Sequence, residues 1–276
     1  MTDKTVVMTG AGGVLCSTLA KALAREGYKI AVLDLAKDAA DKVANEINKK
    51  GGIALGVEAD VLQKTSLEKA KAFINENLGA CDILVNGAGG NHPLGTTSNP
   101  FFELDDLKAT TDGFKTFFDL DTEGIQFTFN LNFIGTLLPT QVFAKDMMGK
   151  EGCSILNISS MNAYTPLTKI PAYSGAKAAV SNFTQWLAVH FSKVGIRVNA
   201  LAPGFFLTAQ NRTLLTESDG SLTTRGNTII GQTPMGRFGE PEDLIGTTLW
   251  LCGEGAAFVT GVVVPIDGGF SAFSGV

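Results

Sequence analysis

The sequence contains few of the residues that cross-link small proteins or build metal sites. Its four cysteines, Cys16, Cys81, Cys153 and Cys252, lie far apart in a chain of 276 residues and form no C-x-x-C pair. This spacing favours neither a disulfide framework nor a zinc site. Free thiols at these positions suit a reducing compartment.

Long apolar runs and an excess of positive charge are also missing. No window reaches the stretch of about 18 apolar residues that spans a bilayer, and no long apolar h-region follows the N-terminus. The 22 basic residues stand against 27 acidic ones, so the net charge of −5 gives no electrostatic reason to expect nucleic acid or a membrane as a partner. We expect a soluble, cytoplasmic protein that binds a small molecule.

Short, β-branched apolar runs alternate with longer segments of helical period. The runs are residues 5–8, 29–33, 53–58, 82–86, 154–158, 196–201 and 262–266. Segments such as 17–26, 36–50 and 176–193 place apolar residues three and four apart. Because strands buried on both faces are continuously apolar, the alternation predicts an α/β fold. We expect a single doubly wound (Rossmann) domain over 1–276, a seven-stranded parallel sheet with helices on both faces.

Two stretches interrupt this alternation. Residues 90–128 are rich in Gly, Asn, Thr and Asp, and the seven acids of 101–128 face only Lys108 and Lys115. Residues 203–237 follow a Pro-Gly pair and show little periodicity. Both follow the carboxyl ends of predicted strands, where doubly wound sheets bind ligands. We therefore expect 90–128 to be a functional insertion and 203–237 to be a substrate lid.

A glycine-rich turn follows the first predicted strand, in residues 9–16 (TGAGGVLC). Such a turn lets backbone N–H groups approach a pyrophosphate at the positive end of a helix dipole, although a tight turn without a ligand would use glycine too. The second strand ends at Asp34, whose carboxylate can accept a hydrogen bond from a ribose 2′-OH and repels a 2′-phosphate. No Arg or Lys lies in the turn or directly after Asp34. The pattern favours NAD over NADP, with an exposed acid at a strand end as the alternative for Asp34.

Tyr173 and Lys177 form a Y-x-x-x-K pattern in a predicted helix. Residues four apart share one helix face, so the phenol and the ammonium group can point into one site. A free phenol titrates near pH 10. A neighbouring cation and an oxidised nicotinamide can together lower that pKa to about 7, where the tyrosine exchanges protons readily. The pattern predicts a tyrosine that acts as a general acid/base.

Further motifs occur in order along the chain. They are Asn86-Gly87-Ala88-Gly89, Asn132-Phe133-Ile134-Gly135, Asn157-Ile158-Ser159-Ser160, Pro203-Gly204 and Asp267-Gly268-Gly269. With the glycine turn and the Y-x-x-x-K pattern, they make the chain resemble the short-chain dehydrogenase/reductase superfamily over nearly its whole length.

The resemblance implies a catalytic set and a cofactor site. Tyr173 would be the general acid/base, Lys177 would lower its pKa and hold the nicotinamide ribose, and Ser160 would stabilise developing alkoxide charge. Asn132 would hold a water in a proton relay behind Lys177. The hydride chemistry belongs to the nicotinamide, so no metal is expected. The implied cofactor contacts are Gly10, Gly12, Gly13, Val14, Leu15, Asp34, Asp60, Val61, Asn86, Ala88, Gly89, Tyr173, Lys177, Pro203, Gly204, Phe206 and Thr208.

The glycine turn departs from the superfamily pattern. In the usual T-G-x-x-x-G-x-G, the second and third glycines are replaced here by Val14 and Cys16. We expect cofactor binding to survive, because Gly12 and Gly13 restore backbone freedom and Cys16 is small enough for close helix packing. The departure leaves open a non-catalytic, nucleotide-sensing protein, although such a protein would not need a complete catalytic set.

Polar side chains near the predicted carbonyl site indicate the class of substrate. They are Asn91, His92, Asn162, Gln210, Asn211 and Arg212. Amides, an imidazole and a guanidinium suit a polyhydroxylated sugar acid better than a steroid, and ordinary polar loop residues are the alternative. Arg212 can clamp a carboxylate with two hydrogen bonds, and Lys169 is the second candidate for that contact.

Three short loops carry a narrower resemblance. Residues 89–93 (GGNHP), 160–163 (SMNA) and 203–208 (PGFFLT), with the 90–128 insertion, are similar to the D-mannonate oxidoreductase (fructuronate reductase) subgroup. This resemblance implies NAD-linked interconversion of D-mannonate and D-fructuronate. The alternatives are a gluconate 5-dehydrogenase or another polyol dehydrogenase, and then a 3-oxoacyl carrier-protein reductase, which would usually need NADP and a basic docking patch.

Helix 176–193 carries more apolar surface than one sheet face is expected to cover. Its large set of apolar residues comprises Ala178, Val180, Phe183, Trp186, Leu187 and Val189. Relatives pair this helix across a two-fold axis, so the resemblance implies a homotetramer, with a dimer as the alternative.

Overall fold

The protein is described here by a computed structural model that covers residues 3–208 and 211–275. These residues form a seven-stranded parallel sheet in the order β3-β2-β1-β4-β5-β6-β7. The strands are β1 (Thr5–Thr9), β2 (Lys29–Asp34), β3 (Ile53–Glu58), β4 (Cys81–Asn86), β5 (Cys153–Ile158), β6 (Ile196–Pro203) and β7 (Val263–Ile266). The predicted α/β fold is confirmed, and every predicted strand agrees to within two residues at each end.

The strand order reverses between β1 and β4. The chain winds outward from β1 to β3 and then returns to pair β4 with the other side of β1. The last residues of these two strands, Thr9 and Asn86, lie opposite each other. Ligands of doubly wound sheets bind outside the carboxyl ends of the strands at such a reversal. The topology therefore places the ligand site above β1 and β4.

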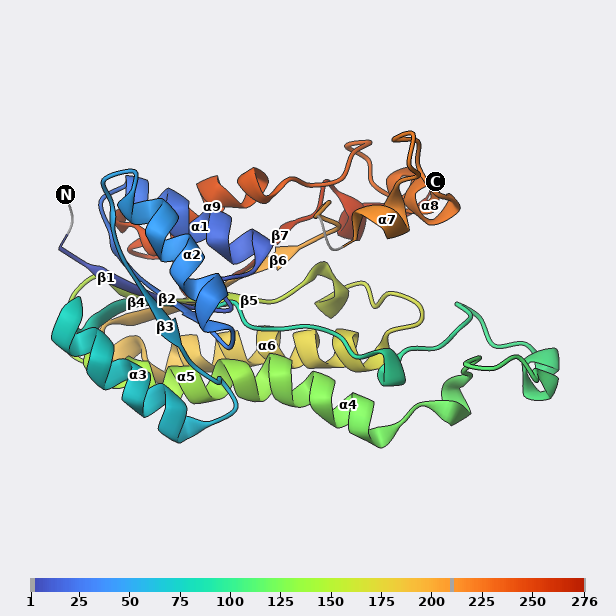
Figure 1. The fold of residues 1–276 in the computed structure, drawn as a ribbon, viewed down its shortest axis with the longest axis horizontal. Helices are drawn as coiled ribbons and strands as arrows, with labels where there is room; N and C mark the ends of the chain where they lie inside the picture. Colours follow the sequence, from blue (N-terminus) through green and yellow to red (C-terminus); the bar gives the residue numbers. More distant parts are fainter. Residues whose placement is uncertain (1–2, 209–210, 276) are drawn as a thin grey trace.

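Helices cover both faces of the sheet (Figure 1). The α-helices are α1 (Val14–Arg25), α2 (Lys37–Asn48), α3 (Lys64–Asn77), α4 (Thr122–Phe129), α5 (Gly135–Phe143), α6 (Pro171–His190), α7 (Arg212–Leu215), α8 (Thr224–Gly231) and α9 (Ile245–Cys252). In Figure 1, α1, α2 and α9 lie on one side of the sheet, and α3, α5 and α6 lie on the other. Within the described residues, no helix is long and apolar enough to cross a membrane.

Shorter helical turns complete the described chain. A π-helical segment, Asn130–Ile134, joins α4 to α5. The 3-10 turns are Pro93–Gly95, Leu104–Lys108, Phe117–Asp119, Ala144–Asp146, Met161–Ala163, Ser192–Val194, Pro241–Leu244, Glu254–Ala256 and Phe270–Ala272.

Each face of the sheet carries its own hydrophobic core. Successive residues of a strand point to opposite faces. Val6 and Met8 of β1 therefore pack with Leu23 of α1, whereas Val7 joins a core that contains Phe143 of α5. The side chains of β1 and α1 in these cores, which are Val6, Val7, Met8 and Leu23, are fully buried. This burial fixes the register of β1 and therefore the position of the loop at its carboxyl end.

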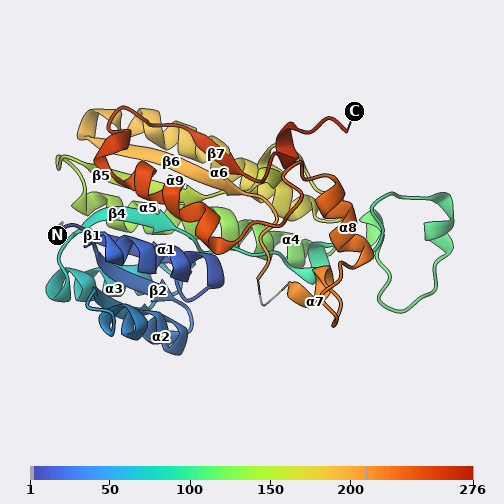
Figure 2. The same ribbon diagram turned by 90° about the horizontal axis from the view of Figure 1, so that it is seen from above.

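The stretch 90–128 is not irregular throughout, as the sequence suggested. Helix α4 begins at Thr122, where the Asp121 carboxylate accepts a hydrogen bond from the Glu123 backbone N–H at 2.7 Å. The helical path then continues through the π-helical segment into α5. The irregular part ends at 121, and residues 97–121, which we call the arm, project from the body of the molecule (Figure 2). The stretch 203–237 likewise contains two helices, α7 and α8.

Candidate active site

The glycine turn between β1 and α1 lets its backbone lie unusually close to the neighbouring backbone after β4. Gly10 has a φ of +62°, and a Cβ atom added there would lie 2.8 Å from the Ala88 backbone. Only glycine fits both conditions. Gly13 is the N-cap of α1 and offers no side-chain cap. The first N–H groups of the helix are therefore left to a ligand, as in an anion site at a helix N-terminus.

Cys16 takes up space that Gly87 leaves open. A Cβ atom on Gly87 would overlap the Cys16 sulfur. Cys16 stands where the family turn has its third glycine, and Gly87, directly after β4, leaves room for the larger side chain. This geometry agrees with the expectation that Cys16 permits close packing. Burial raises the pKa of the Cys16 thiol to about 12, so the group is neutral.

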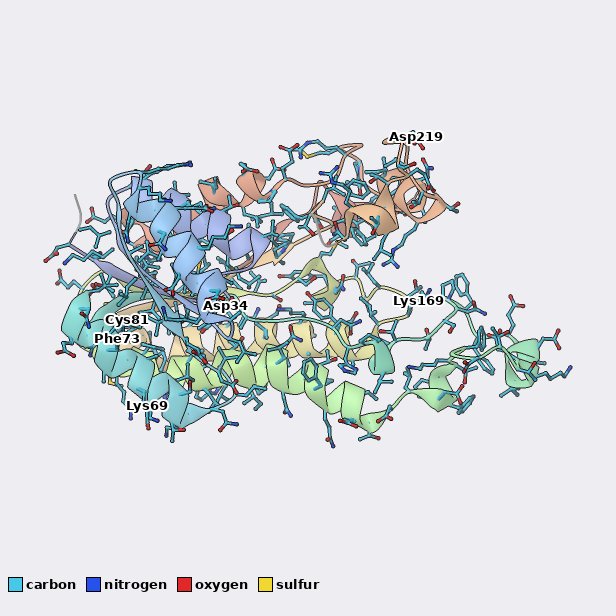
Figure 3. All side chains as sticks on the ribbon, viewed as in Figure 1. Asp34, Lys69, Phe73, Cys81, Lys169 and Asp219 are labelled. Atoms are coloured by element: carbon cyan, nitrogen blue, oxygen red, sulfur yellow. The ribbon has the colours of Figure 1, made fainter. Side chains whose placement is uncertain are left out.

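Asp34, at the end of β2, is hydrogen-bonded to the glycine turn. Its carboxylate accepts hydrogen bonds from the Gly12 N–H at 3.0 Å and the Ala36 N–H at 3.1 Å. A Cβ atom on Gly12 would come within 2.8 Å of the same carboxylate. A carboxylate has about four lone-pair positions, so two remain for a ligand. Figure 3 shows Asp34 between β2 and α2, at the carboxyl end of its strand.

A cavity of about 510 Å³ lies above the carboxyl ends of β1, β2 and β4. Its lining contains nine of the predicted cofactor residues, which are Gly10, Gly13, Val14, Leu15, Asp34, Asp60, Val61, Ala88 and Gly89. It also contains residues that the sequence analysis did not assign, namely Cys16, Leu35, Ala59, Leu62, Gly87, Phe127 and Leu131. The cavity combines an apolar wall, free backbone N–H groups and two carboxylates, those of Asp34 and Asp60, which suits an adenosine diphosphate moiety.

The structure places other predicted cofactor residues outside this lining. They are Gly12, Asn86, Tyr173, Lys177, Pro203, Gly204, Phe206 and Thr208. The Asn86 side chain is buried below the cavity, where its amide donates to Thr140 at 3.0 Å and to Asn157 at 2.9 Å. Asn86 therefore links β4 to β5 and α5, rather than presenting its side chain to the cavity. Phe206 lines a separate cavity of about 200 Å³ beyond β6 and β7.

Tyr173, Lys177 and Ser160 come together where α6 passes the end of β5. The Lys177 ammonium nitrogen lies 5.6 Å from the centre of the Tyr173 ring and donates to the Ile158 carbonyl at 2.8 Å. The Ser160 hydroxyl lies close enough to the Tyr173 phenol to affect its pKa, and it accepts from the Asn162 backbone N–H at 3.2 Å. The predicted acid, cation and hydroxyl thus share one site.

The protonation of this group differs from the expectation for Tyr173. Burial raises the pKa of the Tyr173 phenol, and the hydrogen bond with Ser160 opposes that rise. The expected lowering by Lys177 is absent in the protein alone, because desolvation of the phenolate dominates. Burial lowers the pKa of Lys177 to about 8, and the nearby Cys16 opposes this shift.

Asn132 lies in the π-helical segment and is fully buried. Its amide donates to the carbonyls of Gly90 at 2.6 Å and Thr128 at 2.7 Å. A Cβ atom on Gly89 would lie 2.7 Å from the Asn132 oxygen and 3.1 Å from the Lys177 nitrogen. Gly89 is therefore the point at which Asn132 and Lys177 approach each other. Short π-helical segments occur often at functional sites.

The predicted substrate residues divide by their surroundings. Asn91 donates to Thr96 at 3.0 Å, and the His92 Nδ1 accepts from the Leu94 backbone N–H at 3.2 Å, so both side chains have local roles. Asn162 is 4% exposed, and its side-chain oxygen has no partner among the described residues. Gln210 lies outside the described residues.

The two candidate cations for a carboxylate lie on different loops. Arg212 begins α7, where it is exposed and makes no side-chain hydrogen bond or ion pair within the described chain. Lys169 lies four residues before Tyr173 with a φ of +75°, the one positive φ of a non-glycine residue in the described chain. Its carbonyl accepts from the Thr97 N–H at 2.9 Å. Figure 3 shows Lys169 on the connection to α6, near the base of the arm.

Metal ligands do not gather in the part of the chain that the structure describes. No group of three or more His, Cys, Asp or Glu side chains there could hold a metal ion. The four cysteines are free and buried.

A nucleotide-shaped cavity beside a Ser-Tyr-Lys-Asn group, at the carboxyl end of a doubly wound sheet, defines a dinucleotide-dependent oxidoreductase as the class of protein. The family model of the short chain dehydrogenases matches residues 4–219. The chain belongs to this family, and it is an oxidoreductase.

Similar proteins cover the whole chain. An uncharacterized oxidoreductase of Haemophilus influenzae is 61% identical over 275 residues, which are 99% of this chain and 95% of the relative. The uncharacterized oxidoreductase UxuB of Bacillus subtilis is 50% identical over 277 residues, with 100% and 98% coverage. A crystal structure from Haemophilus influenza, provisionally named D-mannonate oxidoreductase and containing bound NAD, is 58% identical. It has a TM-score of 0.95 and covers 100% of this chain and 98% of its own.

Proposed function

We propose that the protein is an NAD-dependent oxidoreductase that interconverts a hydroxyl and a ketone on a sugar acid, namely D-mannonate and D-fructuronate. The observation that carries the proposal is the juxtaposition of the Asp34-bearing cavity with the Ser160, Tyr173 and Lys177 group. The NAD bound to a solved structure 58% identical to this chain, and the provisional name of that protein, support the cofactor and the substrate. We place the reaction in the cytoplasm.

The residues of the cavity fit the adenosine half of NAD. The Gly10–Gly13 turn and the first N–H groups of α1 would hold the pyrophosphate, and Asp34 would accept from the ribose hydroxyls. Asp60 and Val61 would flank the adenine. Bound NAD supplies the hydride acceptor, and the remaining chemistry belongs to the side chains.

The catalytic residues would move one proton at the substrate oxygen. The Tyr173 phenol donates a proton to the ketone oxygen in reduction and receives it from the hydroxyl in oxidation. The Ser160 hydroxyl donates its one hydrogen bond to the reacting oxygen and stabilises its developing negative charge. Lys177 places its cation beside Tyr173 and stabilises the phenolate, while Asn132 holds the water through which a proton reaches solvent.

Asp34 carries the expected preference for NAD. Replacing it by alanine removes a charge-assisted hydrogen bond, which contributes about 1.5–3 kcal/mol, so NAD affinity should fall about ten- to a hundredfold. NADP should gain relative to NAD, because the charge that repels its 2′-phosphate is lost. The ratio of kcat/KM for the two cofactors measures this change.

A second variant separates charge from turn geometry at this position. Asp34→Asn keeps an oxygen that can accept from the Gly12 N–H, which the carboxylate binds at 3.0 Å, but it removes the negative charge. We expect it to shift the cofactor ratio while retaining thermal stability. If neither variant moves the NAD/NADP ratio, Asp34 serves only the turn.

The cation that binds the substrate carboxylate can be identified by comparing two loops. If Arg212 clamps the carboxylate, Arg212→Ala should raise KM for the sugar acid about ten- to a hundredfold and leave the corresponding uncharged polyol nearly unaffected. Lys169→Ala is the matched variant on the other loop. An equal effect on acid and polyol, or no effect, excludes Arg212 and transfers the role to Lys169 if that variant shows the selective rise.

The substrate assignment itself is tested with a panel of sugar acids and polyols. Each compound is assayed with NAD and NADP by the absorbance of the reduced cofactor, and D-mannonate with NAD should give the highest kcat/KM. A higher value with gluconate or an uncharged polyol would replace the proposed substrate, and a preference for an acyl thioester with NADP would replace the substrate class.

Helix α6 supports the proposal of a homotetramer. Of its apolar residues, Val180 and Leu187 are buried in the chain, whereas Trp186 and Val189 are exposed by 56% and 78%. Trp186 also stacks on His190, with ring centres 4.5 Å apart. The exposed half of this set is the part that a neighbouring subunit would cover.

A further inference from the structure

The arm, residues 97–121, presents large apolar side chains to solvent. Five of them are more than 60% exposed, namely Phe101, Leu104, Leu107, Phe117 and Phe118. Three of the aromatic rings pack edge to face, with the ring centre of Phe118 5.6 Å from those of Phe102 and Phe117. A cluster of this kind on a projecting segment marks an interaction surface.

Polar bonds hold the arm in one shape. Ser98 and Lys115 pair across its base, with hydrogen bonds of 2.8 Å in both directions. The backbone N–H of Thr97 binds the Lys169 carbonyl, and that of Asp121 binds the Leu94 carbonyl, so both ends are attached to the body. These hydrogen bonds therefore determine the conformation of the arm, which has no buried apolar core of its own, and its aromatic rings are exposed to solvent.

The arm also carries most of the net charge of the protein. Its residues, 97–121, contain six acids and two lysines, a net charge of −4, whereas the whole chain has a net charge of −5. The remaining residues nearly balance, with 21 acids (27 − 6) against 20 bases (22 − 2). A partner surface for the arm must therefore combine apolar contacts with positive charge.

A groove of this chemistry lies at the opposite end of the α4–α5 helical path. It has a volume of about 280 Å³ and an apolar floor that includes Met148 and Phe191. Lys64 and Lys145 stand at its edges, and neither has an acidic partner within the described residues. The neighbouring acid, Asp146, is already paired with Lys71.

We propose that the arm of one copy of this chain docks into the Lys64/Lys145 groove of a second copy, and reciprocally. The arm leads into α4 at Thr122, and the groove lies just beyond the end of α5 at Phe143. The 22 residues from Thr122 to Phe143 span about 33 Å at the helical rise of about 1.5 Å per residue. Two copies that pack these helices antiparallel about a two-fold axis bring each arm onto the other's groove. The groove is lined by residues just beyond the ends of α5 and α6, and Figures 1 and 2 show the arm at the opposite end of the molecule from those helix ends, so the arm cannot fill the groove of its own chain.

Changing the charges on either side tests the pairing. The groove variant is Lys64→Glu with Lys145→Glu, and the arm variant is Asp105→Lys with Asp112→Lys, which brings the net charge of residues 97–121 from −4 to 0. The groove variant places like charges together at both contacts of the pair, and the arm variant removes the attraction, so the self-association of each should weaken by at least about tenfold. Sedimentation equilibrium of each variant and the natural chain over a range of concentrations gives the dissociation constants.

Mixing the two variants provides the decisive measurement. In a mixed pair, the acidic arm of the groove variant meets a basic groove, which restores one natural contact, and the neutral arm of the arm variant meets an acidic groove without repulsion. Native mass spectrometry with one copy mass-tagged should therefore show mixed pairs well above the statistical proportion. The matched control is Lys42→Glu with Lys49→Glu, exposed lysines within and directly after α2, which should associate like the natural chain.

Three results would overturn the proposal. The natural chain could remain monomeric at all concentrations, the variants could associate as tightly as the natural chain, or the mixed pairs could form only in the statistical proportion. Loss of association in the α2 control to the same extent would also exclude a specific arm–groove contact.

Discussion

Tyr173→Phe is expected to lower kcat by at least about a hundredfold while NADH binding stays within a few-fold of the natural enzyme. The substitution removes the phenol oxygen, whose pKa the Ser160 hydroxyl affects, and keeps the ring, whose centre lies 5.6 Å from the Lys177 ammonium nitrogen. The proton donor is lost, whereas the packing of α6 beside the cavity is retained. The cofactor contacts assigned above involve the glycine turn and Asp34, which the substitution does not touch.

Single-turnover and steady-state assays with D-mannonate, together with fluorescence titration of NADH, separate chemistry from binding. Tyr28→Phe is the matched control, because Tyr28 lies directly before β2, at the opposite end of the strands from the site. It should retain normal kcat. A Tyr173→Phe enzyme with near-normal kcat on any good substrate would remove the proposed acid/base from the mechanism.

The sequence identified the sheet because its strands are buried on both faces and therefore continuously apolar. Helix α4 was missed for a local reason: its start depends on the Asp121 cap, and its continuation passes through a π-helical segment that breaks the usual spacing. The Y-x-x-x-K pattern could be recognised because four-residue spacing alone puts Tyr173 and Lys177 together.

Contacts between distant parts of the chain carried no such signal. Cys16 and Gly87 are 71 positions apart (87 − 16), and their complementary sizes become visible only when β1 and β4 lie side by side. Phe127 lines the cavity from α4 and Leu131 lines it from the π-helical segment, neither of which the sequence predicted. The direction of the Tyr173 pKa shift also depends on burial, which no motif records.

Lys177→Met is expected to reduce kcat/KM at least about a hundredfold, because it removes the cation that faces the phenol and the nicotinamide ribose. It should also change how stability depends on pH. The folded pKa of Lys177 is lowered by burial to about 8, against 10.5 for a free lysine. Below pH 8 both the folded and unfolded states carry the charge, and the folded state bears the cost of burying it.

Between pH 8 and 10.5 the folded Lys177 is neutral, while the unfolded lysine still binds its proton. The unfolded state then holds more protons, so the free energy of unfolding rises with pH, by about 3 kcal/mol across this window. The natural chain should gain this stability relative to Lys177→Met as the pH rises from 7 to 10.5, measured by urea unfolding of both proteins. Lys69→Met on the outer face of α3 (Figure 3) is the exposed control, and its profile should run parallel to the natural chain. The free energy of unfolding of Lys177→Met could instead change with pH in parallel with that of the natural chain. In that case the Lys177 ammonium group is not desolvated, and a lowered pKa of Lys177 cannot be what adjusts the pKa of Tyr173.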